Sequence, residues 1–122
     1  MKRRLSGEPA EARVADVLEA AGWSILGRRV RLGAYELDLV ARRDDVVAIV
    51  EVRGRRAGAW VSAFDSISPT KRARLVAAAR RLWSTRLAGD PSVRVLRIDV
   101  ASVTYDARGA HVEIAEGAIA VG

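Results

Sequence analysis

The chain has 122 residues, no cysteine, a formal net charge of +6, and hydrophobic side chains at half of its positions. This length suits a single domain over residues 1–122, and the missing cysteine excludes disulfides, thiolate metal sites and cysteine nucleophiles. No apolar run approaches the roughly 20 residues of a membrane-spanning helix, so we expect a cytoplasmic protein without a membrane partner.

The basic charge favours a polyanionic partner such as nucleic acid. Only Lys2 and Lys71 are lysines among the 21 basic residues, and alanine is abundant. An arginine- and alanine-rich chain is also typical of a GC-rich genome. The charge therefore leaves two interpretations open, a nucleic-acid-binding surface and a compositional bias without functional meaning.

The first predicted elements are a helix and a strand. Apolar side chains recur at helical spacing over residues 6–21, and Glu8 lies near the positive end of the helix dipole. A strand is expected over residues 23–32, and Gly33 ends it.

The next two segments, 35–42 and 46–53, predict a hairpin that turns at residues 44–45. In this register Val40 opposes Ile49. Successive side chains of a strand point to opposite faces of the sheet, so the register also decides which polar side chains meet.

This register brings acidic side chains together at the end of the hairpin away from its turn. Asp38 faces Glu51, and Glu36 faces Arg53, all on one face of the sheet. The opposite face is expected to carry Leu37, Leu39, Val50 and Val52. Three acids within cross-strand reach are costly unless a cation offsets their repulsion. That cation is either a divalent metal held by Asp38 and Glu51, or Arg53 paired with Glu36.

The second half of the chain predicts another helix and two strands. Ser68 as N-cap and Pro69 at the first position indicate a helix over residues 69–87. Strands are expected over 93–105 and 111–115, joined by a turn. The buried stripe of the helix is expected to contain Leu75, Ala79, Leu82 and Trp83. A mixed sheet with a helix on each face satisfies this order of elements.

Several short motifs follow one another along the chain: Gly7-Glu8, Glu36-Leu37-Asp38-Leu39-Val40-Ala41, Val50-Glu51-Val52-Arg53-Gly54-Arg55, Ala63…Ile67…Lys71…Arg74 and Arg97-Ile98-Asp99. In this order they resemble the YraN-like family of small bacterial proteins. That family is similar to the PD-(D/E)XK nuclease superfamily and to archaeal Holliday junction resolvases. The resemblance implies an α/β, restriction-endonuclease-like core of helix, three strands, helix and strand, with a mixed sheet flanked by helices.

The resemblance also implies a function, namely a Mg²⁺- or Mn²⁺-dependent DNA endonuclease, acting on branched DNA as a homodimer. Asp38 and Glu51 match the superfamily's metal-binding acids, and Arg53 stands at the position of its catalytic lysine. These three are the implied catalytic residues. The implied supporting acids are Glu8 and Glu36, and the implied nucleic-acid contacts are Arg55, Lys71 and Arg74.

Two positions depart from the family pattern. Tyr35 stands where a glycine usually precedes Glu36, and Arg53 replaces the lysine. Arginine suits phosphate oxygens but cannot act as a base, because its pKa lies above about 12. Three functions therefore stay open: a nuclease, a nucleic-acid-binding module that has lost cleavage, and a protein–protein adaptor whose charge is only compositional.

Overall fold

The computed structural model describes residues 4–56 and 67–121, and it describes side chains over residues 10–54 and 67–121. Two α-helices, one π-helical turn and five strands make up this part of the chain. In chain order they are α1 (Arg4–Ala20), β1 (Ser24–Leu32), β2 (Tyr35–Arg43), β3 (Val46–Arg56), α2 (Pro69–Leu82), η1 (Trp83–Leu87), β4 (Val95–Asp106) and β5 (Gly109–Ile119). Neither described helix is long and apolar enough to cross a membrane.

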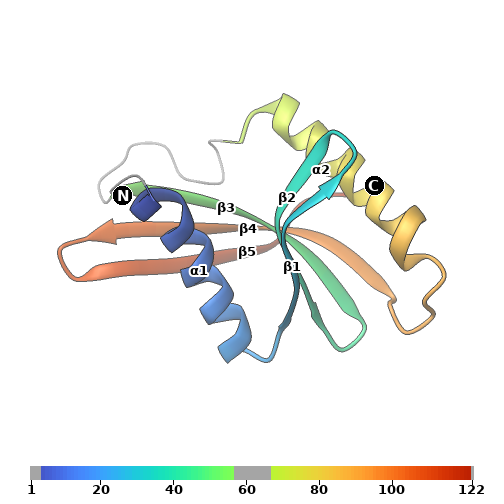
Figure 1. Cartoon of the computed structure of the whole chain (residues 1–122), viewed down its shortest axis with the longest axis horizontal. Helices are drawn as coiled ribbons and strands as arrows, with labels where there is room; N and C mark the ends of the chain where they lie inside the picture. The colour runs from blue at the N-terminus through green and yellow to red at the C-terminus, as the bar shows by residue number, and fades with distance from the viewer. Residues whose placement is uncertain (1–3, 57–66, 122) are drawn as a thin grey trace.

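The strands form one mixed sheet in the order β1-β2-β3-β4-β5. Only β3 and β4 pair in parallel, and the other neighbouring strands pair antiparallel. Figure 1 shows the strong twist of this sheet, with α1 and α2 on opposite sides of it. This α/β architecture, with helix, three strands, helix and strand in order, is the one that the family resemblance implies.

Each helix covers its own apolar core. Leu75, Ala78 and Leu82 of α2 pack in one cluster with Val47 and Ile49 of β3. Val14 and Leu18 of α1 pack in a second cluster with Ala48 and Val50 of the same strand. Alternate residues of β3 thus supply the two cores, as expected for a strand buried on both faces.

Helix α2 begins as its sequence predicts and ends differently. The Ser68 side chain accepts a hydrogen bond from the Lys71 backbone N–H, and Pro69 opens the helix. After Leu82 the α-helical pattern gives way to a π-helical turn that the Ala88 N–H closes on the Trp83 carbonyl. Trp83 itself keeps α-helical dihedral angles and donates its backbone N–H to the Ala79 carbonyl, but its side chain is exposed. The prediction that Trp83 is buried was therefore wrong.

The predicted hairpin register is confirmed near the turn. Val40 pairs with Ile49, and the pairing continues to Arg43 and Val46. Asp44 takes a positive φ of 55°, as the first residue of a tight two-residue hairpin turn often does.

The predicted alternation fails further from the turn. Leu37 packs in the α2-side cluster, whereas Leu39 packs in the α1-side cluster, so these two leucines do not share a face. The neighbouring strand changes face at the same point, since Val30 pairs with Leu37 and Arg28 pairs with Leu39. Between them Arg29 has a φ of 51°, in the left-handed region. The change of face thus falls at the same level of the two paired strands, at Arg29 of β1 and Asp38 of β2.

Candidate functional site

Asp38 lies where β2 leaves the regular ladder. The pairing between β2 and β3 stops at Leu39 and Val50. Beyond that point the Asp38 Oδ2 atom accepts a hydrogen bond of 2.8 Å from the Val52 backbone N–H. The carboxylate thereby replaces a ladder contact, and this bond fixes it beside the neighbouring residue of β3, Glu51.

Glu51 is a buried acid between two cations. Its side chain is only 3% exposed, whereas Lys71 and Arg53 are each more than one third exposed. The Oε2 atom of Glu51 lies 3.6 Å from the Lys71 Nζ atom and 3.8 Å from an Arg53 nitrogen. The other oxygen, Oε1, is buried and accepts no hydrogen bond from the described residues.

These surroundings make the Glu51 carboxyl an unusually weak acid. Its pKa is raised to about 7, first by burial, then by the adjacent Asp38 charge and by a hydrogen bond that the protonated Glu51 can donate to Asp38. Lys71 and Arg53 act in the opposite direction without cancelling the rise. Near neutral pH, Lys71 and Arg53 therefore do not supply enough positive charge to stabilise Asp38 and Glu51 when both are ionised.

Glu36 takes a different partner from the one considered in the sequence. It lies 3.6 Å from Arg31 on β1, and the two side chains are largely exposed. Arg53 instead lies beside Glu51, on its own strand. The ion pair seen for Glu36 is thus with Arg31, and Arg53 contributes its charge to the buried acid.

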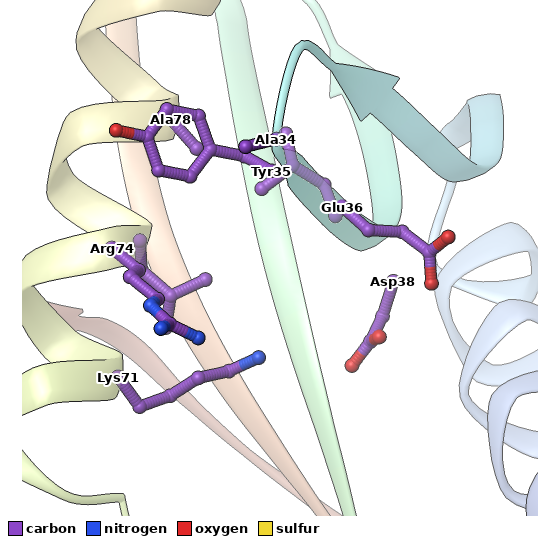
Figure 2. Close-up of a pocket in the computed structure, with 9 residues that line it drawn as sticks. Ala34, Tyr35, Glu36, Asp38, Lys71, Arg74 and Ala78 are labelled. Atoms are coloured by element: carbon purple, nitrogen blue, oxygen red, sulfur yellow. The ribbon is translucent and has the colours of Figure 1, made fainter.

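A pocket of about 230 Å³ opens beside this cluster, between the β1–β2 hairpin and α2. Figure 2 shows Lys71 and Arg74 reaching into it from α2, opposite Glu36 and Asp38 of β2. Tyr35 lines the same pocket. In the sequence, Tyr35 is notable only because it stands where the family usually has a glycine, and that difference alone did not predict a role in the site.

The donor set of the cluster fits a hard divalent cation. Asp38 and Glu51 present carboxylate oxygens, one of them buried and without a hydrogen-bond donor among the described residues. Magnesium is usually held by one or two carboxylates, with water and substrate phosphate completing its octahedron. No three acidic, histidine or cysteine side chains gather as a metal cluster within the described part of the chain. The described residues therefore offer a two-carboxylate site of the open, substrate-completed kind.

The structure brings together most of the predicted site residues. Asp38, Glu51, Arg53 and Lys71 meet at the carboxylate pair, and Glu36 and Arg74 line the adjoining pocket. Two predicted side chains, Glu8 of α1 and Arg55 of β3, lie outside the described side chains.

The family model described as "Uncharacterised protein family UPF0102" matches residues 10–103, which include all of this cluster. A protein of that family from Sorangium cellulosum is 45% identical over 117 residues, covering 95% of this chain and 81% of its own length. One from Myxococcus xanthus is 38% identical, covering 99% and 94%. These matches agree with the resemblance to YraN-like proteins.

Two solved structures are similar in outline. An fdxN element excision controlling factor from Anabaena variabilis is 17% identical, with a TM-score of 0.44, covering 81% of this chain and 91% of that one. Pyrococcus furiosus SfsA is 16% identical, with a TM-score of 0.45, covering 93% and 62%. These similarities are too weak to carry a functional conclusion.

Proposed function

We propose that this chain, which belongs to the UPF0102 family, is a metal-dependent endonuclease that hydrolyses phosphodiester bonds in DNA. The observation that carries the proposal is the pair formed by Asp38 and buried Glu51, beside Lys71 and Arg53. An acid buried at 3% exposure, with one oxygen to which no described residue donates, is unfavourable as a purely structural feature.

Asp38 and Glu51 are the proposed metal ligands. Asp38 is held by the Val52 N–H, and Glu51 is held by the central strand of the sheet, so neither ligand has to be ordered when the cation arrives. Bound Mg²⁺ or Mn²⁺ would polarise the phosphate and favour ionisation of the attacking water.

Lys71 and Arg53 are the proposed phosphate contacts. Both contact the same carboxylate oxygen and both are partly exposed, so a phosphate entering the site can meet them from solvent. Lysine and arginine are strong donors to phosphate oxygens, and Arg74 lines the pocket close by. Lys71 stands beside the second acid, and we assign to it the charge-stabilising role that the superfamily gives to the lysine replaced by Arg53.

The proposed reaction is a hydrolysis. A bond forms between the water oxygen and phosphorus, and the bond from phosphorus to the leaving sugar oxygen breaks. The water loses one proton to solvent, and the leaving oxygen gains one, so the reaction needs no other reactant. Within the chain, Asp38 and Glu51 would hold the cation, which would polarise the reacting phosphate. Lys71 and Arg53 lie where they can stabilise the growing negative charge on the phosphate.

The test compares cleavage and metal binding in matched variants. Wild type, Asp38→Asn, Glu51→Gln and the control Glu113→Gln are incubated with labelled branched, single-stranded and duplex DNA, with Mg²⁺, Mn²⁺ or EDTA. Glu113 is an exposed acid on β5, two strands away from Glu51 of β3, and it is not one of the proposed site residues. Calorimetric titration with Mn²⁺ gives a readout that is independent of cleavage.

We expect metal-dependent cleavage in wild type and Glu113→Gln, and at least a hundredfold loss, with weakened Mn²⁺ binding, in the two site variants (a loss of about 100-fold corresponds to ~3 kcal/mol). If wild type cleaves none of these substrates, the proposed endonuclease activity is wrong. If DNA binding in EDTA then persists unchanged in Asp38→Asn and Glu51→Gln, the chain is a nucleic-acid-binding module instead.

A further inference from the structure

The pocket beside the carboxylate pair is lined by Asp38 and Lys71 of the proposed site, and also by Tyr35, which has no role in the proposed cleavage chemistry. Its walls differ in charge, with Lys71 and Arg74 of α2 on one side and Glu36 and Asp38 of β2 on the other. At about 230 Å³ it is smaller than the ~300–1,000 Å³ of typical small-molecule sites. A space of this size suits one planar ring system with its attached groups better than a stacked base pair.

Tyr35 gives this pocket an aromatic wall. The side chain is half-buried and packs against the α2-side core while also lining the pocket. Figure 2 shows its ring lying toward Ala78 of α2, at the end of the pocket away from Lys71. A ring fixed by the core is an ordered stacking surface, and stacking on tyrosine is a common way to hold an unpaired base.

Arg74 places a positive charge at the pocket that has no acidic partner among the described residues. Its side chain is exposed, and it forms no ion pair or side-chain hydrogen bond with the described residues. It lies one helical turn from Lys71, so the two cations share one wall. The acids of the opposite wall repel phosphate, and therefore the phosphate of an entering nucleotide belongs on the α2 side.

We propose that this pocket binds a single unpaired nucleotide next to the scissile phosphate, with its base stacked on Tyr35 and its phosphate on Arg74. The inference rests on the proposed function for the identity of the ligand as nucleic acid. It adds a substrate preference: DNA with an unpaired nucleotide at the cleavage position, as in single strands and at branch points. Duplex DNA reaches the pocket only at the cost of unpairing a base.

The test measures binding without cleavage. Fluorescence anisotropy in EDTA gives the affinity for a labelled single-stranded oligonucleotide and for the same sequence in a blunt duplex. The variants are Tyr35→Leu, Tyr35→Phe and Arg74→Ala. The controls are Trp83→Leu, an exposed aromatic residue outside the pocket, and Arg13→Ala, an exposed arginine on α1, across the sheet.

We expect Tyr35→Leu to weaken single-strand binding about tenfold and duplex binding by less than about twofold, with Tyr35→Phe and Trp83→Leu close to wild type. Arg74→Ala should reduce the slope of log affinity against log salt for the single strand by about 0.7, and Arg13→Ala should leave it unchanged. As a check that does not depend on a variant folding, an unpaired 2-aminopurine in the oligonucleotide should lose fluorescence on binding wild type.

An equal effect of Tyr35→Leu on single strand and duplex, no effect on either, or unquenched 2-aminopurine would overturn the pocket proposal. The result is separable from the nuclease test. If cleavage requires Asp38 but does not change in Tyr35→Leu, only the pocket proposal fails. If single-strand binding depends on Tyr35 but no cleavage occurs, only the nuclease proposal fails.

Discussion

The Nζ atom of Lys71 lies 3.6 Å from the Oε2 atom of Glu51, so helix α2 brings a lysine to the buried end of the carboxylate pair. The lysine expected on β3, two residues after Glu51, is Arg53 instead. The positive charge beside Glu51 therefore comes from two elements, Arg53 from β3 and Lys71 from α2 across the pocket.

This arrangement predicts unequal roles for the two cations. Lys71→Ala should lower the cleavage rate about 100-fold, because it removes a preorganised charge from the reacting phosphate. Arg53→Lys should change the rate by less than about threefold, since it keeps one charge of the pair and leaves Lys71 in place. Single-turnover cleavage rates check both values. A large gain in Arg53→Lys would show instead that the strand position limits the activity.

Glu51→Gln is expected to abolish cleavage and yet to stabilise the metal-free protein at pH 8. The raised pKa of Glu51 shows that burial and Asp38 disfavour the charged carboxylate more than Lys71 and Arg53 favour it. A neutral amide of the same shape avoids that cost, so the free energy of unfolding of Glu51→Gln should exceed that of wild type by about 1–3 kcal/mol. Urea unfolding in EDTA measures the difference. A less stable Glu51→Gln protein would mean that the ion pairs outweigh the burial.

The same group predicts how stability depends on pH without metal. The pKa of Glu51 rises from 4.5 to about 7 on folding, so between these values the folded state binds more protons than the unfolded state. The stabilising contribution of Glu51 to the free energy of unfolding is then fully present below about pH 4.5, and it is lost as the pH rises through about 7. Urea unfolding at several pH values in EDTA should show this fall in wild type.

Two comparisons isolate Glu51 as the source of that fall. Glu51→Gln should lack the corresponding part of the slope. Mn²⁺ affinity of wild type should increase over the same pH window, because the cation has to displace the proton from the carboxyl. A wild-type slope that survives in Glu51→Gln would assign the effect to other groups.

The reversal of faces at Asp38 predicts which core residues are energetically coupled. Leu37 and Leu75 belong to the α2-side cluster, and Leu18 belongs to the α1-side cluster. Each leucine-to-alanine change should cost about 2–5 kcal/mol. A double-mutant cycle should show coupling of at least about 0.5 kcal/mol between Leu37 and Leu75, and additivity between Leu37 and Leu18. Coupling to Leu18 instead would contradict the reversal.

Local patterns are sufficient to predict the elements and the hairpin. The turn at residues 44–45 fixes the pairing of Val40 with Ile49, and Ser68-Pro69 marks the start of α2 through its cap. These features depend on neighbouring residues alone. They are also enough to predict that Asp38 and Glu51 lie side by side.

The details of the site depend on contacts between distant segments, and local patterns do not contain them. Arginine rarely adopts a positive φ, so nothing in the sequence marks Arg29 as the point where two strands reverse. The approach of Lys71 to Glu51 follows from how α2 lies on the sheet. Helical spacing from Ala79 predicts a buried Trp83, yet this side chain is exposed, and the π-helical turn that begins at Trp83 has no sign in the sequence pattern.

The left-handed Arg29 also limits how the lengths of these two strands can change. Since Val30 pairs with Leu37 on one side of the reversal and Arg28 pairs with Leu39 on the other, a deletion in one strand alone would move Leu37 out of its core. Matched deletions in β1 and β2 would instead shorten the hairpin and preserve every pairing below it. Length variation at this tip is therefore expected to occur in pairs of residues, one from each strand.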